Sequence, residues 1–165
     1  MSDAQSLIAL IPRLRRYARA LVGDRAAADD LVQDTLERAW SKLHLFQRGT
    51  DLRAWLFTVM HNVHVNQVRS ARPTDELDEE MPELAQRAAQ GDALLIRDLE
   101  RGIAALPVAQ RQVLLLVALE DLSYEQTARV LDIPIGTVMS RLARAREKLR
   151  TSMYGKGGTK LQVVK

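Results

Sequence analysis

The sequence contains no cysteine, which excludes disulfides and thiolate metal sites and is typical of proteins in a reducing cytosol. Aromatic residues make up only 4% of the chain, although hydrophobic residues make up 47%. The core must therefore be built mainly from Leu, Val, Ile and Ala. With only 8 Gly and 5 Pro, this composition favours helices over strands.

Long apolar runs are also absent from the sequence. No run approaches the roughly 20 residues that are needed to span a bilayer. The first residues, MSDAQSLIALIPRLRR, lack the basic-then-apolar order of a signal peptide. We therefore expect a cytoplasmic protein that is not inserted in a membrane.

Charge is segregated along the chain, behind a net charge of +3. Residues 1–73 contain 11 Lys/Arg against 7 Asp/Glu, residues 74–100 contain 2 against 9, and residues 101–165 contain 11 against 5. Two basic segments separated by an acidic one suggest two modules that face polyanions, joined by a segment that avoids them. Proteins without a nucleic-acid role also segregate charge, so this pattern alone leaves both interpretations open.

Apolar residues recur at three- and four-residue steps through the first part of the chain, which predicts amphipathic helices. The predicted helical stretches are Leu7–Leu21, Val32–Leu43 and Leu52–Arg72. Pro12 interrupts the first stretch and is expected in the first turn of its main helix, which ends at Gly23-Asp24. Pro73 stops the third helix.

The stretch Pro73–Glu83 is acidic, contains two prolines and shows no periodic stripe, so it is predicted to be a linker. Helical pattern returns at Leu94 and breaks at Leu106-Pro107. It continues in a helix over Val113–Leu119 that is apolar enough to be strongly buried.

These patterns predict an all-α protein of two small helical domains, formed by residues 1–73 and 94–154. An acidic linker over residues 74–93 joins them, and residues 155–165 are expected to form a disordered tail.

Two pairs of side chains could have a functional role, but we predict no such role for either pair. Trp40 and Trp55 lie on apolar stripes and are predicted to belong to the core. His61 and His64 lie three positions apart on a helix, but they have no third ligand nearby in the sequence. We therefore predict no bound metal, and no cofactor.

The stretch Leu122–Arg150 predicts a helix-turn-helix. Ser123 and Gln126 have the spacing of a capping box, which begins a short helix. Pro134 cannot continue that helix, and a second helix opens at Gly136. The residues that can pack the two helices together are Leu131, Ile133, Val138, Leu142 and Ala145.

The exposed face of the second helix carries cations that suit DNA, because arginine can bind guanine with two hydrogen bonds and lysine suits phosphate. The predicted DNA-contacting residues are Thr137, Ser140, Arg141, Arg144, Arg146 and Lys148, with Arg150 flanking them. An ordinary amphipathic helix with a solvated basic face is the alternative. The capping box and the basic helix at this spacing together favour DNA binding.

Three segments resemble a known family, the extracytoplasmic-function (ECF) sigma factors of bacterial RNA polymerase. The family's fourth conserved region is similar to LSYEQTARVLDIPIGTVMSRLARAREKLR, its second region to ADDLVQDTLERAW, and its promoter-melting helix to LRAWLFTVMHNVHVNQVRS. The resemblance covers roughly residues 10–152. It implies a transcription initiation factor, without enzymatic activity, that binds core RNA polymerase and promoter DNA and is held inactive by an anti-sigma factor.

The resemblance also implies sites in the first domain. Core polymerase would be bound by Asp30, Leu31, Gln33, Asp34 and Glu37. Three of these residues, Asp30, Asp34 and Glu37, share one helical face, and a solvated acidic face is the alternative. The minus-ten element and its melted non-template strand would be bound by Phe46, Arg48, Asn62, Asn66, Gln67, Arg69 and Arg72. For Asn62 a buried amide bonded to backbone is the alternative.

The second domain would bind the minus-thirty-five element through its basic helix, where the sequence departs from the family pattern. Met139 replaces the usual Lys/Arg, and Ala143 occupies a position that is often larger or polar, so contacts with the promoter are lost. Asp132 stands where Gly is common, and Asp tolerates the left-handed conformation less well than Gly.

Three other classes of protein remain as alternatives. A sigma-like decoy that titrates an anti-sigma factor would need the helical shape but not Ser140, Arg141 and Arg144. A dimeric helix-turn-helix regulator would not need the DLVQD and WLFTVMHN segments. An enzyme is disfavoured, because the sequence has no nucleophile–base set, glycine-rich phosphate loop or metal cluster.

Overall fold

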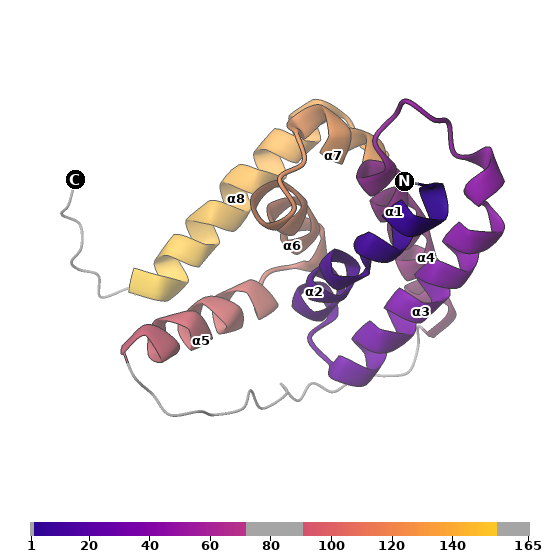
Figure 1. Ribbon diagram of the computed structural model, residues 1–165. Coiled ribbons are helices and arrows are strands. Elements are labelled where there is room, and N and C mark those ends of the chain that lie inside the picture. Colours follow the sequence, from indigo (N-terminus) through magenta and orange to yellow (C-terminus); the bar gives the residue numbers. More distant parts are fainter. Residues whose placement is uncertain (1, 72–90, 155–165) are drawn as a thin grey trace.

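The computed structural model describes residues 2–71 and 91–154, and every regular element in these ranges is a helix (Figure 1). The first range contains α1 (Asp3–Ala9), α2 (Ile11–Val22), α3 (Arg25–Ser41), the 3-10 turn η1 (Leu43–Leu45) and α4 (Leu52–Ala71). The second contains α5 (Gly91–Ala104), α6 (Val108–Leu114), the π-helical turn η2 (Leu115–Leu119), α7 (Tyr124–Leu131) and α8 (Ile135–Tyr154). The prediction of an all-α fold is confirmed. Most of the predicted linker, the predicted tail and Arg72 lie outside the described residues.

Local signals set the ends of the N-terminal helices. Pro12 lies in the first turn of α2, where its missing N–H costs no hydrogen bond. Gly23 ends α2 in the left-handed conformation, with φ of +85°. Asp24 then begins α3, because its carboxylate accepts a 2.9 Å hydrogen bond from the Ala27 N–H. The helix boundaries predicted at these residues are confirmed.

The predicted capping box begins α7. The Ser123 hydroxyl accepts a hydrogen bond from the Gln126 N–H (3.0 Å), and the Gln126 side-chain oxygen accepts one from the Ser123 N–H (2.9 Å). Asp132 ends α7 in the left-handed conformation, with φ of +58°. The following N–H, from Ile133, donates back to the Ala128 carbonyl at 3.0 Å. The helix-turn-helix geometry of α7 and α8 is therefore as predicted.

The N-terminal unit, α1 to α4, has a core in which Tyr17 of α2 packs edge-on against Phe57 of α4, with ring centroids 5.0 Å apart. Trp40 is not part of this core, and the prediction that it is buried is wrong, because its side chain is 57% exposed. The preceding Ala39 is fully buried, and one position along a helix turns a side chain by about 100°. Trp55 is half-buried and packs against the core.

The C-terminal unit, α5 to α8, is held together by apolar side chains that were predicted for it. Leu131, Val138, Leu142 and Ala145 are buried, and Ile133 packs against them half-buried. Two helices approach closely at Gly102 of α5, where an added Cβ would lie 2.7 Å from the Leu149 side chain of α8. Gly102 thus lets α5 lie against α8.

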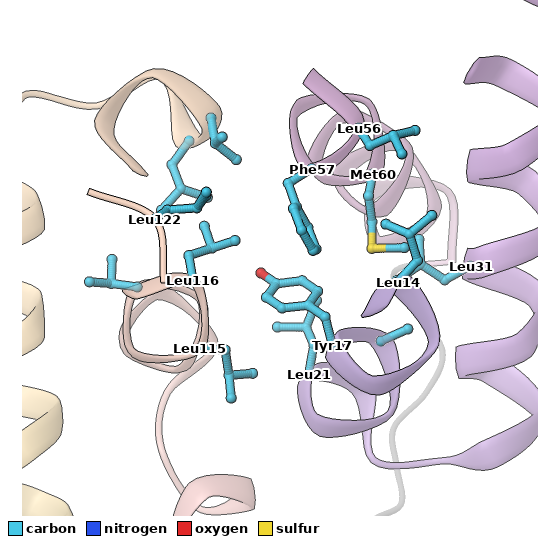
Figure 2. Close-up of a cluster of buried hydrophobic side chains, with 14 of the residues drawn as sticks. Leu14, Tyr17, Leu21, Leu31, Leu56, Phe57, Met60, Leu115, Leu116 and Leu122 are labelled. Carbon is cyan, nitrogen blue, oxygen red and sulfur yellow. The ribbon is translucent and has the colours of Figure 1, made fainter. Parts of the chain in front are cut away.

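The two units pack against each other, so the described residues form a closed arrangement (Figure 1). In the close-up, Tyr17, Leu21 and Phe57 of the N-terminal unit face Leu115 and Leu116 of the C-terminal unit (Figure 2). All five side chains are buried. In addition, α4 packs against α7. The sequence left the placement of the two units open, and the structure has them in contact.

Candidate functional site

A hollow of about 820 Å³ lies between α3 and α4. Its lining includes the carboxylates predicted to bind core polymerase and two amides predicted to bind the minus-ten element. These residues are Asp30, Asp34, Glu37, Asn66 and Gln67. The prediction that the three acidic residues share one face is confirmed, and two predicted sites thus meet along one groove.

Within this hollow the Gln67 Nε2 donates a 2.7 Å hydrogen bond to Asp34 Oδ2, which joins α4 to α3. Gln33 is exposed beside the hollow, on the outer side of α3. Leu31 was predicted as a contact for core polymerase, but it has no exposed surface. It is one of the residues of α3 that anchor this helix in the core, so a direct contact in this arrangement is excluded.

The outer side of α4 is polar, as predicted. Asn62, Asn66 and Arg69 are exposed, while Gln67 is half-buried. Because Asn62 is exposed, the alternative that it is a buried amide bonded to backbone is wrong. Its amide is available to a partner.

The loop before α4 is arranged around an aromatic pair. The Phe46 ring lies 5.5 Å from the Trp55 ring, with 52° between their planes. Arg48 forms an ion pair with Asp3 at 3.5 Å and is otherwise well exposed. The contribution of Trp55 to this loop was not predicted from the sequence, because the apolar spacing of Trp55 predicts a core residue. In the structure its ring packs against Phe46, which is a predicted site residue.

The helix α8 presents its predicted residues to solvent. Ser140, Arg144, Arg146 and Lys148 are exposed, whereas Thr137 and Arg141 are half-buried. Met139, which departs from the family pattern, is 50% exposed on the same helix. The flanking Arg150 is paired with Glu147 at 2.9 Å. The structure therefore brings most of the predicted cations to one accessible helix.

The two histidines of α4 are half-buried. Burial lowers the pKa of His61 and of His64, and for His64 the neighbouring His61 and Arg111 lower it further. For His61 the Asp132 carboxylate of the C-terminal unit opposes the effect of burial. Within residues 2–71 and 91–154, no group of three His, Cys, Asp or Glu side chains is placed to hold a metal ion.

Comparison with known proteins accounts for both units. Residues 7–61 match the family described as the sigma2 domain of PhyR, and residues 96–149 match region 4 of Sigma-70. The ECF RNA polymerase sigma factor EcfG of Rhodopseudomonas palustris is 36% identical over 153 residues, which cover 92% of this chain and 84% of that protein. The chain belongs to the ECF RNA polymerase sigma factors. Another such sigma factor, SigL of Mycobacterium tuberculosis, is 37% identical over 157 residues, 89% of this chain and 86% of SigL.

Two solved structures have a similar arrangement of helices. The sigma factor RpoE of Bartonella quintana, in complex with the anti-sigma factor NepR, superposes with a TM-score of 0.78 at 34% identity, over 91% of this chain and 95% of RpoE. PhyRSL of Sphingomonas sp. Fr1, in complex with NepR, superposes with a TM-score of 0.66 at 25% identity, over 98% of each chain. The predictions of two helical sigma domains and of a role in transcription initiation are confirmed.

The sigma2 match runs from within α1 into α4, and the region 4 match runs from within α5 into α8. The α5 helix begins at Gly91, three residues before the predicted start of the second domain. Among the described residues, no helix is both long and apolar enough to cross a membrane.

Proposed function

We propose that this sigma factor binds core polymerase with α3, the minus-ten element with α4 and the Phe46 loop, and the minus-thirty-five element with α8. The functional domains would be residues 1–73 and 94–154. The observation that carries the proposal is the separation of charge: carboxylates line a groove of one unit, while exposed cations cover a helix of the other.

The acidic groove fits a protein partner better than DNA. Asp30, Asp34 and Glu37 would repel phosphates, but they complement a basic surface on another protein. Gln33 and Trp40 are exposed on the adjoining side of α3. Together these residues form a docking surface for core polymerase that combines charge with one large apolar side chain.

The minus-ten interface requires groups that bind unstacked bases. The Phe46–Trp55 pair supplies aromatic surface on which a flipped base can stack, since every base has a π-face. The exposed amides of Asn62 and Asn66 can hydrogen-bond base edges, and Arg48 and Arg69 can bind phosphates. Capture of an unstacked base offsets the cost of opening the duplex without covalent chemistry, so no enzymatic activity is proposed.

The minus-thirty-five interface uses the N-terminal half of α8. In a helix-turn-helix, the second helix enters the major groove with its first residues nearest the bases. Ser140, Arg141 and Arg144 are then in position to read base edges, while Arg146 and Lys148 bind backbone phosphate.

We further propose that an anti-sigma factor related to NepR regulates this protein. RpoE of Bartonella quintana and PhyRSL, to which the chain is similar along nearly its whole length, were each solved with NepR. A shared fold over both domains supports a shared mode of binding. The protein would act in the cytoplasm, where polymerase and promoter DNA are found.

A second candidate function is that of a decoy for the anti-sigma factor. It is favoured by the match of residues 7–61 to the sigma2 domain of PhyR, because a solved PhyR is described as an anti-anti-sigma factor. A decoy does not read DNA, so the exposed Ser140, Arg144 and Lys148 on α8 favour the sigma factor instead.

Run-off transcription separates the two functions. Purified bacterial core polymerase and sheared genomic DNA of the source organism are incubated with and without the protein. Discrete transcripts that depend on the protein support the sigma factor, and they should be lost in the double variant Arg144→Ala/Lys148→Ala. If no transcript forms and the protein fails to co-elute with core polymerase, the decoy is the better function.

A further inference from the structure

Glu120 is a fully buried carboxylate at the boundary between the two domains. It directly follows η2 in the C-terminal domain, and its side chain has 0% exposure. Its two oxygens are paired with two arginines of α2, in the N-terminal domain. Arg13 Nη1 lies 3.4 Å from Oε1, and Arg16 Nη2 lies 3.2 Å from Oε2. The buried carboxylate is thus compensated by cations from the other domain.

A second polar link lies one turn further along α2. The Arg111 guanidinium donates to carbonyls at the end of α5 and in the loop that follows, namely Ile103 (3.1 Å), Ala104 (3.0 Å) and Leu106 (2.7 Å). It also donates to the Leu21 carbonyl, at the C-terminus of α2 in the other domain. A cation at this position satisfies a free helix carbonyl and complements the helix dipole.

Tyr17 lies between these two links. Its hydroxyl points toward Leu116 across the boundary (Figure 2), and burial together with the Glu120 carboxylate raises its pKa. A third link closes the far end of the boundary, where Gln126 Nε2 donates to Asp51 Oδ2 at 2.9 Å. Polar contacts therefore flank the apolar interface between the domains.

The closed arrangement is incompatible with the promoter complex. On the proposed function, α4 and α8 bind elements that are roughly 25 base pairs apart, which is roughly 85 Å of duplex at about 3.4 Å per base pair. In the structure α4 packs directly against α7, the partner of α8 in the helix-turn-helix. A helix of 20 residues such as α8 is only about 30 Å long. The domains must separate before both elements can be bound.

We propose that Glu120, Arg13 and Arg16 form a latch that holds the two domains closed and so restrains the protein from engaging a promoter by itself. This inference rests on the proposed function for its consequence, but the latch can be tested without polymerase. An ionic latch suits a reversible contact, because the buried Glu120 carboxylate regains water when the domains part, and the two arginines are already partly exposed.

The test measures the distance between the domains in the full-length protein. Since the chain has no cysteine, Ala26→Cys on α3 and Thr151→Cys on α8, both at exposed positions, can be labelled with a fluorescent donor and acceptor. The test variant is Arg13→Ala/Arg16→Ala. Its matched control is Arg15→Ala/Arg19→Ala, which removes two exposed arginines of the same helix that form no ion pair within the described residues.

The labelled protein without further substitutions should show high energy transfer between donor and acceptor. Arg13→Ala/Arg16→Ala should raise the fraction of open molecules about tenfold, with helix content unchanged by circular dichroism. Glu120→Gln should act in the same direction, and the triple variant should open no further than either, because all three changes remove one interaction. If the fraction of open molecules in the test variant is no larger than in the control variant, the latch is refuted.

A second measurement tests the proposed consequence of the latch, self-inhibition, separately from the latch itself. The association rate with core polymerase is measured for the same labelled proteins. Faster association of Arg13→Ala/Arg16→Ala than of the control supports self-inhibition, and equal rates overturn it. If no labelled protein binds core polymerase, the proposed function fails, while the energy-transfer result on the latch still stands.

Discussion

The amide of Gln67 donates a hydrogen bond of 2.7 Å to the carboxylate of Asp34, and so ties the helix proposed to bind the promoter to the helix proposed to bind polymerase. Both residues line the same hollow. This exposed contact adds to the packing of α3 against α4, so the positions of the two helix faces are coupled.

Asp34→Asn is expected to weaken binding to core polymerase roughly fivefold, since one exposed charge contributes about 1 kcal/mol. The amide keeps the hydrogen bond from Gln67 within reach, so stability in urea should not change. Binding is measured by fluorescence anisotropy at two salt concentrations, and the difference should shrink at high salt. Asp29→Asn, an exposed change outside the hollow, is the control. An equal loss of affinity in both variants would contradict the assignment of the hollow as the polymerase-binding surface.

Trp40→Ala is expected to reduce the affinity for core polymerase by a larger factor, roughly thirtyfold, as for tryptophan at the centre of an interface. Its side chain is 57% exposed on α3, so its loss should leave the midpoint of thermal unfolding nearly unchanged. Ile8→Ala, which removes another apolar side chain with 58% exposure, tests whether any exposed apolar residue has this effect. Unchanged affinity in Trp40→Ala would show that core polymerase does not bind at Trp40.

The two α8 variants Arg144→Ala and Lys148→Ala should change DNA binding in different ways. Loss of a base contact by Arg144 should cost about 1–3 kcal/mol on the cognate promoter and relax specificity at one position. Loss of a phosphate contact by Lys148 should weaken binding to all sequences and lower the salt slope by about 1. Both are measured by gel shift of the polymerase complex on a promoter mapped by run-off transcription. Arg101→Ala on α5 is the control, and a uniform loss in all three variants would contradict the assignment.

Stability should fall as the pH drops below about 6.5, the ordinary pKa of histidine. Burial lowers the pKa of His61 and His64 in the folded state, so the unfolded chain binds protons more readily. The neutral rings thus contribute stability that is present above the unfolded pKa and is lost as the pH falls through the folded pKa. Urea unfolding at pH 7.5 and pH 5.5 should show a smaller difference in His61→Gln/His64→Gln. The exposed His44→Gln should keep the full difference, and an identical profile in both would refute the account.

Local features of the fold could be predicted because they depend on neighbours in the sequence. Pro12, Gly23 and the Ser123–Gln126 capping box begin and end helices through contacts within a few residues. Burial was harder, because apolar spacing shows the direction of a helix face but not its width. Trp40 was therefore given the wrong environment. Leu31 was assigned to the polymerase contact by the resemblance to the family, which does not show that its side chain is buried.

The closed arrangement could not be predicted, since its contacts join residues that are far apart in the chain. Arg13 and Glu120 are separated by 107 positions, and Arg16 and Glu120 by 104. Nothing in the pattern around Glu120 distinguishes it from a solvated carboxylate. The candidate site was more accessible to prediction, because α3, α4 and α8 each carry their polar groups on one continuous helix.

The π-helical turn over Leu115–Leu119 determines where the Glu120 carboxylate points. Its hydrogen bond from the Glu120 N–H to the Leu115 carbonyl, 3.0 Å long, spans five residues where an α-helix spans four. If the same residues were wound as a regular α-helix, the side chains that follow would be rotated by about 100°. The carboxylate would then leave the side that faces α2. This turn thus sets the direction of Glu120 and of the chain that leads into α7 relative to α6. Relatives that have the same number of residues here but a regular helix should lack the charged contact even where they keep the glutamate.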